Sequence, residues 1–168
     1  HYTETTECHI TGGDWTVGEA LFFVKSENVY LKVDGAKVKT GKYLVHAIVN
    51  DDDAATKVPD DMKLKCYGVN VVIANGDYQG DIVNDDTDRT MNVSILHAKV
   101  AGVITDAYVS LEGSQWTATG DSTVCLVGDV KETQIDAVSG ITVRAVAGEG
   151  CGLKGEYTLA SGGKLVAG

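Results

Sequence analysis

Proline is almost absent from this chain, since Pro59 is the only one in 168 residues. No apolar run approaches the roughly 20 residues that a membrane-spanning helix needs, so the sequence predicts no membrane span. Basic residues are scarce too: 14 Lys and Arg stand against 24 Asp and Glu, which gives a formal net charge of −10. Because nucleic acids and anionic membranes attract basic surfaces, we expect neither as a partner.

The motifs of common enzymes are missing as well. The sequence has no Gly-x-Ser-x-Gly nucleophile motif and no basic phosphate-binding loop. His46 and His97 each stand between apolar neighbours in strand-like segments, which is more typical of a structural histidine than of a general base. We therefore expect a protein that is not an enzyme and requires no cofactor, with Trp15 and Trp116 in its core.

Four cysteines, Cys8, Cys66, Cys125 and Cys151, form no C-x-x-C pair, which argues against a zinc site or a redox dithiol. An even number of cysteines in an acidic chain predicts two disulfides and an extracellular or cell-surface location. Of the three possible pairings, Cys8–Cys66 with Cys125–Cys151 closes the shortest loops. The alternative is four buried free thiols in an intracellular protein.

Short bursts of β-branched and aromatic residues, separated by turn residues, predict many short strands. Val29, Leu31 and Val33 alternate with more polar neighbours, as in a strand with one buried face. Asp34-Gly35 and Asn75-Gly76 both fit the two-residue turn that requires positive φ, so each predicts a β-hairpin. Further strands are expected at residues 15–24, 36–40, 43–49, 62–73, 78–83, 91–97, 100–104, 107–111, 123–127, 141–147 and 153–159.

This pattern predicts an all-β fold of about ten to twelve strands, with a turn about every ten residues. The expected architecture is a two-layer antiparallel β-sandwich of jelly-roll or immunoglobulin-like type with an exchangeable terminal strand. No linker composition and no repeat of fixed period is visible. Residues 14–168 are therefore predicted to form one domain, preceded by residues 1–13 as an extension.

Aspartates cluster in two stretches that are candidate calcium loops. Asp51 and Asp53 belong to the first, and Asp86 and Asp88 follow Asn84 with the opening spacing of a calcium loop. Arg89 stands where the usual loop has glycine, so this is not an EF-hand. Ca²⁺ is the metal we expect if one binds, and the alternative is that these residues serve turns and solubility.

Two further residues suggest chemistry of their own. A free amino-terminal His1, with His9, His46 or His97 as a second ligand, could hold copper in a histidine brace. In this one residue the chain resembles lytic polysaccharide monooxygenases and small copper carriers. Asn92 opens the only N-glycosylation sequon, Asn92-Val93-Ser94.

The amino-terminal segment carries the main functional expectation. Tyr2, Thr6, Cys8 and Ile10 would share one face of a strand, and the segment ends at Gly12-Gly13. Such a strand can cover the open edge of a neighbouring sheet, and head-to-tail repetition of that contact builds a fibre.

In this layout the chain resembles donor-strand-linked pilins and related extracellular filament proteins. The resemblance implies a structural subunit of an extracellular filament or pilus-like appendage, with other copies of the chain as its partner and residues 1–13 as the donor strand. Cys8 departs from that plan: bonded to Cys66 in the same chain it would hold the strand at home, and bonded between chains it would lock the fibre. Two alternatives are a secreted carbohydrate- or ligand-binding β-sandwich module, which would contact surface glycans, and a copper protein.

Overall fold

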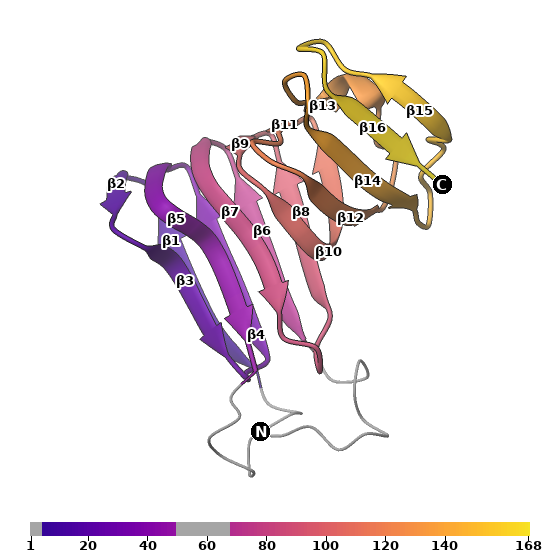
Figure 1. Ribbon diagram of the computed structural model, residues 1–168. Helices are drawn as coiled ribbons and strands as arrows, with labels where there is room; N and C mark the ends of the chain where they lie inside the picture. The colour runs from indigo at the N-terminus through magenta and orange to yellow at the C-terminus, as the bar shows by residue number, and fades with distance from the viewer. Residues whose placement is uncertain (1–4, 50–67) are drawn as a thin grey trace.

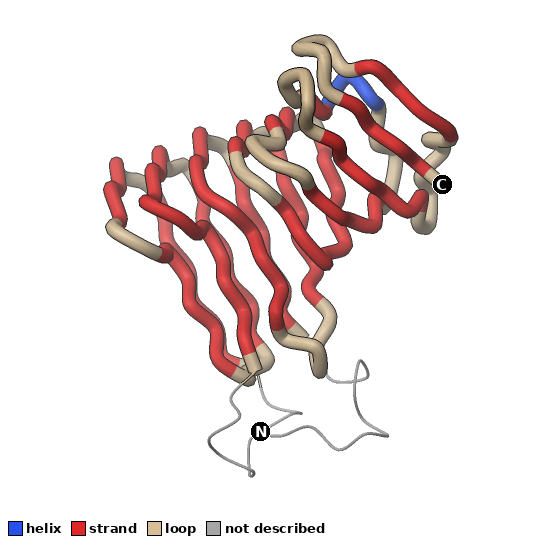
Figure 2. The backbone as a smooth tube through the Cα atoms, viewed as in Figure 1, coloured by secondary structure: helices blue, strands red, loops and turns tan. Residues whose placement is uncertain are grey.

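The computed structural model describes residues 5–49 and 68–168, and almost all of its regular structure is β-strand (Figures 1 and 2). The single helical element in this part of the chain is the short 3₁₀ turn η3, Glu132–Gln134. The predicted all-β fold is therefore confirmed. Within the described ranges, no helix is long and apolar enough to cross a bilayer.

Sixteen strands follow one another along the chain. They are β1 Thr6–Thr11, β2 Asp14–Val17, β3 Ala20–Lys25, β4 Val29–Asp34, β5 Lys37–Ile48, β6 Val69–Ala74, β7 Asp77–Asp85, β8 Met91–Leu96, β9 Lys99–Ala101, β10 Ile104–Glu112, β11 Gln115–Thr117, β12 Ser122–Leu126, β13 Ile135–Asp136, β14 Thr142–Ala147, β15 Gly155–Thr158 and β16 Lys164–Ala167.

These strands are stacked as the coils of a parallel β-solenoid. The longest row of paired strands runs β1-β4-β6-β8-β10-β12-β14-β16-β15. A second row pairs β2, the start of β5, the start of β7, β9, β11 and β13. A third pairs β3, the end of β5, the end of β7 and the start of β10. Each coil thus contributes one strand segment to each row, and the coils lie side by side in Figure 1.

The predicted antiparallel sandwich is therefore wrong in its pairing. Among the described residues, β15 and β16 form the only antiparallel strand pair. β4 pairs with β1 and β6 and not with β5, so Asp34-Gly35 is not a hairpin turn. It is a corner at which the chain leaves one row of strands for the next.

The corners explain why the turn residues were recognised and their meaning was not. One corner stacks five residues with left-handed backbone: Gly12, Gly35, Asn75, His97 and Gly113. A positive φ is needed at each coil, and glycine and asparagine tolerate it best. The same conformation serves a hairpin turn, so local sequence cannot distinguish a hairpin from a solenoid corner.

Backbone crowding fixes glycine at the following corner. A Cβ atom on Gly41 would lie 2.0 Å from the carbonyl oxygen of Gly18, and one on Gly102 would lie 2.0 Å from that of Gly80. Successive coils therefore stack backbone on backbone there, which only glycine permits.

A repeat exists, although its length varies. Thr6 pairs with Val29, 23 residues on, while Val93 pairs with Val109, only 16 residues on. Val29 pairs with Val69, 40 residues on, because that interval contains residues 50–67. The expectation of no repeat is therefore corrected: the coils shorten along the chain, which hides the period from a search at fixed spacing.

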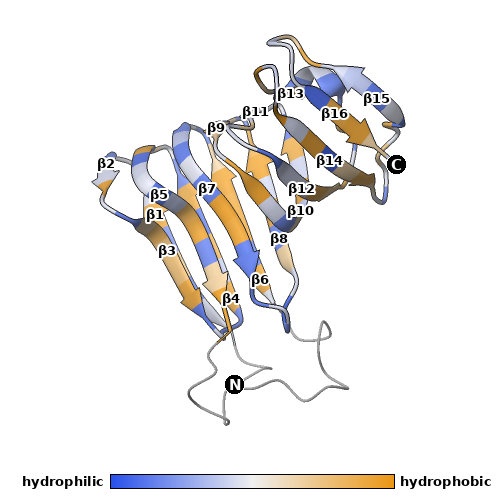
Figure 3. Ribbon diagram, in the orientation of Figure 1, coloured by the Kyte–Doolittle hydropathy of each residue, from blue (hydrophilic) through white to orange (hydrophobic). Residues whose placement is uncertain are grey.

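The core lies inside the coils. Alternate residues of each strand point inward and stack on the equivalent residues of the next coil, as in the buried row Leu31, Val71, Val93, Val109 and Leu126. Figure 3 shows the resulting bands of hydrophobic and hydrophilic residues along the strands. Each such side chain contributes about 1.5–3 kcal/mol on burial, so every inner coil is stabilised from both sides.

Candidate functional site: the open first coil

β1 lies at one edge of the nine-strand row, and its only partner is β4 of the same chain. Its other side faces no strand of the described residues. A free strand edge presents unpaired N–H and C=O groups that can pair with another chain. β2 and β3 likewise pair on one side only, each with β5.

The inward-facing side chains of this first coil are exposed. Cys8 and Ile10 stack on the buried Leu31 and Val33, yet Cys8 is exposed and Ile10 only half-buried. Trp15 stacks on the buried Val38 and is 43% exposed. These three apolar side chains have the direction of core residues, and no coil among the described residues covers their outer side.

This position corrects the expectation for the two tryptophans. Trp116 is fully buried, as expected for a core residue, and its indole N–H donates to the carbonyl oxygen of Gly102 at 2.9 Å. Trp15 is not in a closed core, although its indole N–H donates to the carbonyl oxygen of Gly12 at 2.9 Å. The alternation within residues 14–17 could have identified Trp15 as inward-facing, but not that its coil stands at the end of the stack.

Polar groups line the outer face of β1. Glu7 and His9 point away from the core, and His9 Nε2 lies 3.6 Å from a carboxylate oxygen of Glu7. The His9 ring also meets the ring of Tyr30 edge-on, with centroids 5.6 Å apart. The free edge therefore has one apolar side and one side with opposite charges two residues apart.

The opposite end of the solenoid is covered. Leu153 and Leu159, which flank β15, are buried, and Tyr157 packs against the same core. The chain turns back there, so that β15 runs antiparallel to β16. Solenoids need such terminal caps to shield their last coil, and in the described residues only the carboxyl-terminal end has one.

A hydrogen-bonded carboxylate holds this cap to the last coils. Asp136 on β13 accepts hydrogen bonds from the backbone N–H of Ser161 at 2.8 Å and from its hydroxyl at 2.5 Å. These bonds, the hydroxyl's first, lower the pKa of Asp136 below its usual value. A depressed carboxyl pKa stabilises the fold above the unfolded value of about 3.9, and this contribution is lost as the pH falls through the folded pKa.

We therefore expect Asp136→Asn to flatten the loss of stability on the acid side. Thermal unfolding of the wild type and the variant between about pH 2 and pH 6 measures this. Asp14→Asn, an exposed carboxylate on β2, is the matched control and should keep the wild-type slope. An unchanged acid-side slope for Asp136→Asn would contradict the assignment.

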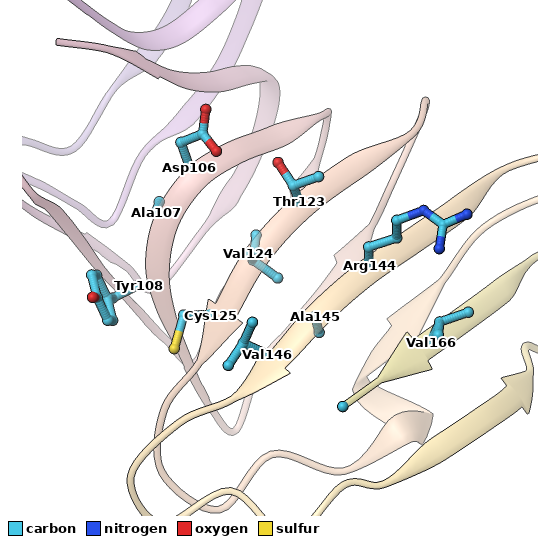
Figure 4. A pocket seen from close by; sticks show the side chains of 11 residues that line it. Asp106, Ala107, Tyr108, Thr123, Val124, Cys125, Arg144, Ala145, Val146 and Val166 are labelled. Carbon is cyan, nitrogen blue, oxygen red and sulfur yellow. The ribbon is translucent and has the colours of Figure 1, made fainter. Parts of the chain in front are cut away.

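A second surface feature is a shallow hollow of about 630 Å³ on the outer side of β10, β12, β14 and β16. Figure 4 shows Tyr108, Cys125 and Val146 along one side, and Asp106, Thr123 and Arg144 along the other. Burial raises the pKa of the Cys125 thiol, and the nearby Cys151 raises it further, so this thiol is a poor nucleophile. The hollow contains no histidine and offers no nucleophile–base pair.

The three histidines that the structure describes lie apart. His9 is on β1, and His97 occupies a corner. His46 on β5 hydrogen bonds to a carboxylate oxygen of Asp85 at 2.8 Å, and its ring stacks on Tyr43 with centroids 4.1 Å apart. These contacts fit the expected structural role of His46. His1, on which the copper hypothesis depends, lies outside the described residues.

The predicted calcium ligands are placed in part. Asp51 and Asp53 lie outside the described residues. Asp86 is buried, and its two carboxylate oxygens accept hydrogen bonds from the backbone N–H of Asp88 and from Arg89. Within residues 5–49 and 68–168, no group of three or more His, Cys, Asp or Glu side chains could hold a metal ion. Calcium binding stays a prediction.

The remaining predicted residues are placed as follows. Cys8, Cys125 and Cys151 are free thiols, and Cys66 lies outside the described residues, so both disulfides stay predictions. Asn92 is exposed on β8, where its amide donates to the side-chain oxygen of Asn70 at 3.2 Å. Of the predicted assembly residues, Thr6, Cys8 and Ile10 share the inward face of β1, and Tyr2 is not described.

Comparison with known proteins yields no relative: no family model, no curated protein and no solved structure matches the chain. The function must therefore be inferred from the chain itself.

Proposed function

We propose that this protein is a structural subunit of an extracellular filament or pilus-like appendage, joined to its neighbours by β-strand addition at the open first coil. The observation that carries the proposal is the free edge of β1, beside which the inward-facing Cys8, Ile10 and Trp15 are exposed. A rigid stack of coils with an uncovered end has the form of a building unit.

Energetics favour covering this end. Each well-buried apolar side chain contributes about 1.5–3 kcal/mol, and Ile10 and Trp15 would gain much of this if another β-structure continued the stack. Backbone pairing along β1 would add direction and register. In a solenoid each coil contacts only its neighbours, so a further coil from another chain can replace one from the same chain.

The manner of addition differs from a donor strand. Because β1 pairs along its full length with β4 of its own chain, it need not leave its sheet to form a contact. The neighbour would instead continue the sheet beyond β1 and cover the same residues that the donor strand was expected to insert.

Growth of a fibre needs a second contact, because one interface used once closes a dimer. The opposite edge of the same row is β15, whose outer side pairs with no described strand. Contacts at both edges would place the solenoid axes in line along the filament.

Sedimentation velocity and negative-stain electron microscopy of the full-length protein test the proposal. We expect concentration-dependent assembly in the wild type, and a folded monomer for the double variant Ile10→Asp/Trp15→Asp, since charge would be buried at the joint. Phe23→Asp is the matched control: Phe23 is on the same coil and 58% exposed, but it points away from the core. A wild type that stays monomeric at high concentration would overturn the proposal.

A further inference from the structure

The sequence of β1 is complementary to itself about Cys8. Thr6, Cys8 and Ile10 face inward, while Glu7 and His9 face outward on either side of Cys8. Turned end over end about Cys8, the strand therefore places each outward acidic group opposite an outward imidazole. This symmetry is a property of the free edge already described.

We propose that the partner of β1 is the β1 strand of a second copy of this chain, paired antiparallel about a two-fold axis at Cys8. This inference rests on the proposed function and names the partner at that joint. Cys8 faces Cys8 of the second copy, and Glu7 faces His9 of the second copy, twice by symmetry. Thr6 faces Ile10 of the second copy in the same way.

The register follows from two requirements. Pairing an inward residue with an outward one would turn one copy's apolar face to the solvent, so the axis must pass through a residue and not between two. An axis at Glu7 would place two carboxylates opposite each other, and an axis at His9 would place two imidazoles opposite each other, whereas like charges at such positions destabilise a sheet. An axis at Cys8 pairs every outward group with its complement.

The ends of the solenoid explain why the contact is two-fold. The carboxyl-terminal end is covered by its own cap, with Leu153 and Leu159 buried, so it offers no open core to receive Ile10 and Trp15. Two open first coils can cover one another, because a two-fold interface uses the same patch on both copies. The resulting dimer exposes two capped ends, and the β15 edges there are the sites for further growth.

Cys8 gives this arrangement a direct chemical readout. Directly opposite residues in an antiparallel pair have Cα atoms about 4.5–5.5 Å apart, which lies within the range of about 4.4–6.8 Å that a disulfide spans. With oxidised glutathione as the oxidant, the two Cys8 thiols lose two protons and two electrons and become a disulfide. The glutathione disulfide takes up both and becomes two thiols.

Cysteine mapping on the full chain tests the register. In a background with Cys66, Cys125 and Cys151 changed to Ser, we expect oxidised glutathione to convert the protein to a covalent dimer through Cys8. Adding Cys8→Ser should abolish the dimer, and Cys8→Ser with Thr6→Cys and Ile10→Cys should restore it. Cys8→Ser with Ile10→Cys alone should not, since those two residues would lie about 13 Å apart.

Charge variants test the same register without oxidation. His9→Glu should weaken dimerisation by about 2- to 30-fold, because both complementary pairs become carboxylate pairs. Glu7→His combined with His9→Glu exchanges the two positions and should restore it. Sedimentation equilibrium under reducing conditions measures both.

Three results would overturn the inference, and they are distinguishable. Covalent dimers from Ile10→Cys alone would place the axis elsewhere. Assembly without any cross-link at Cys8 would indicate a head-to-tail contact and would leave the proposed function standing. A chain that is monomeric at every concentration, reduced or oxidised, would remove the inference and the proposed function together.

Discussion

Replacing Trp116 with alanine is expected to lower the free energy of unfolding by about 3–5 kcal/mol. The indole is fully buried on β11, between Val100 on β9 and Ile135 on β13. Truncation would leave a cavity inside the narrowest coils and would also remove the hydrogen bond to the Gly102 carbonyl oxygen. Urea denaturation followed by circular dichroism measures the change.

Two variants separate these causes. Trp116→Phe keeps most of the volume and loses the hydrogen bond, so it should cost clearly less than Trp116→Ala. Trp15→Ala removes the same side chain from the open coil, where it is 43% exposed, and should cost less again in the monomer. Equal losses for Trp15→Ala and Trp116→Ala would contradict the assignment of Trp15 to an uncovered end.

The sequence reveals the strands of this fold better than their pairing. Alternation in Val29–Val33 identifies β4 because one strand face is buried in a sandwich and in a solenoid alike. The partner of Val29, however, is Val69, 40 residues away. Nothing in the local pattern specifies a partner at that distance, so the turns at Asp34-Gly35 and Asn75-Gly76 favoured the nearer, antiparallel strand.

The candidate site was predictable to a similar degree. Alternation placed Thr6, Cys8 and Ile10 on one face, and they do share the inward face of β1. The contribution of Trp15 was not foreseen, because inward-facing residues are buried in every coil except an uncovered one. Exposure of Trp15 depends on the order of coils, which is a property of the whole stack.

The loop after β7 shows how one residue changes the meaning of a motif. Asn84, Asp86 and Asp88 have the spacing of calcium ligands, but Asn84 and Asp86 accept hydrogen bonds from the backbone N–H groups two residues on. Arg89 supplies the positive charge beside Asp86, with Nη1 3.2 Å from a carboxylate oxygen. The spacing alone suits both arrangements, and only burial of the guanidinium distinguishes them.

Removal of that guanidinium is the second change from which we expect a large effect. Arg89 is 1% exposed, and its Nε donates to the side-chain oxygen of Asn28 at 3.0 Å. Arg89→Ala would leave Asp86 buried without its cation, which typically costs about 3–5 kcal/mol. Arg144→Ala, an exposed arginine on β14, is the control and should change stability by less than about 0.5 kcal/mol.

The loss should depend on pH in a defined direction. Burial raises the pKa of Asp86, while the Asp88 N–H and the Arg89 charge act to lower it. Without Arg89 the pKa rises further, and a raised carboxyl pKa gives stability that is present at low pH and lost as the pH rises through it. Chemical denaturation at several pH values should therefore show the deficit of Arg89→Ala shrinking toward acid.

Replacing both partners separates the cost of an unpaired charge from the worth of the pair. Arg89→Met/Asp86→Leu removes the two buried charges together and should recover most of the stability lost in Arg89→Ala, because buried ion pairs repay little more than their own desolvation. If the double variant is as unstable as Arg89→Ala, then the hydrogen bonds of this cluster to Asn28 and Asp88, and not the isolated Asp86 charge, hold the corner between β7 and β8.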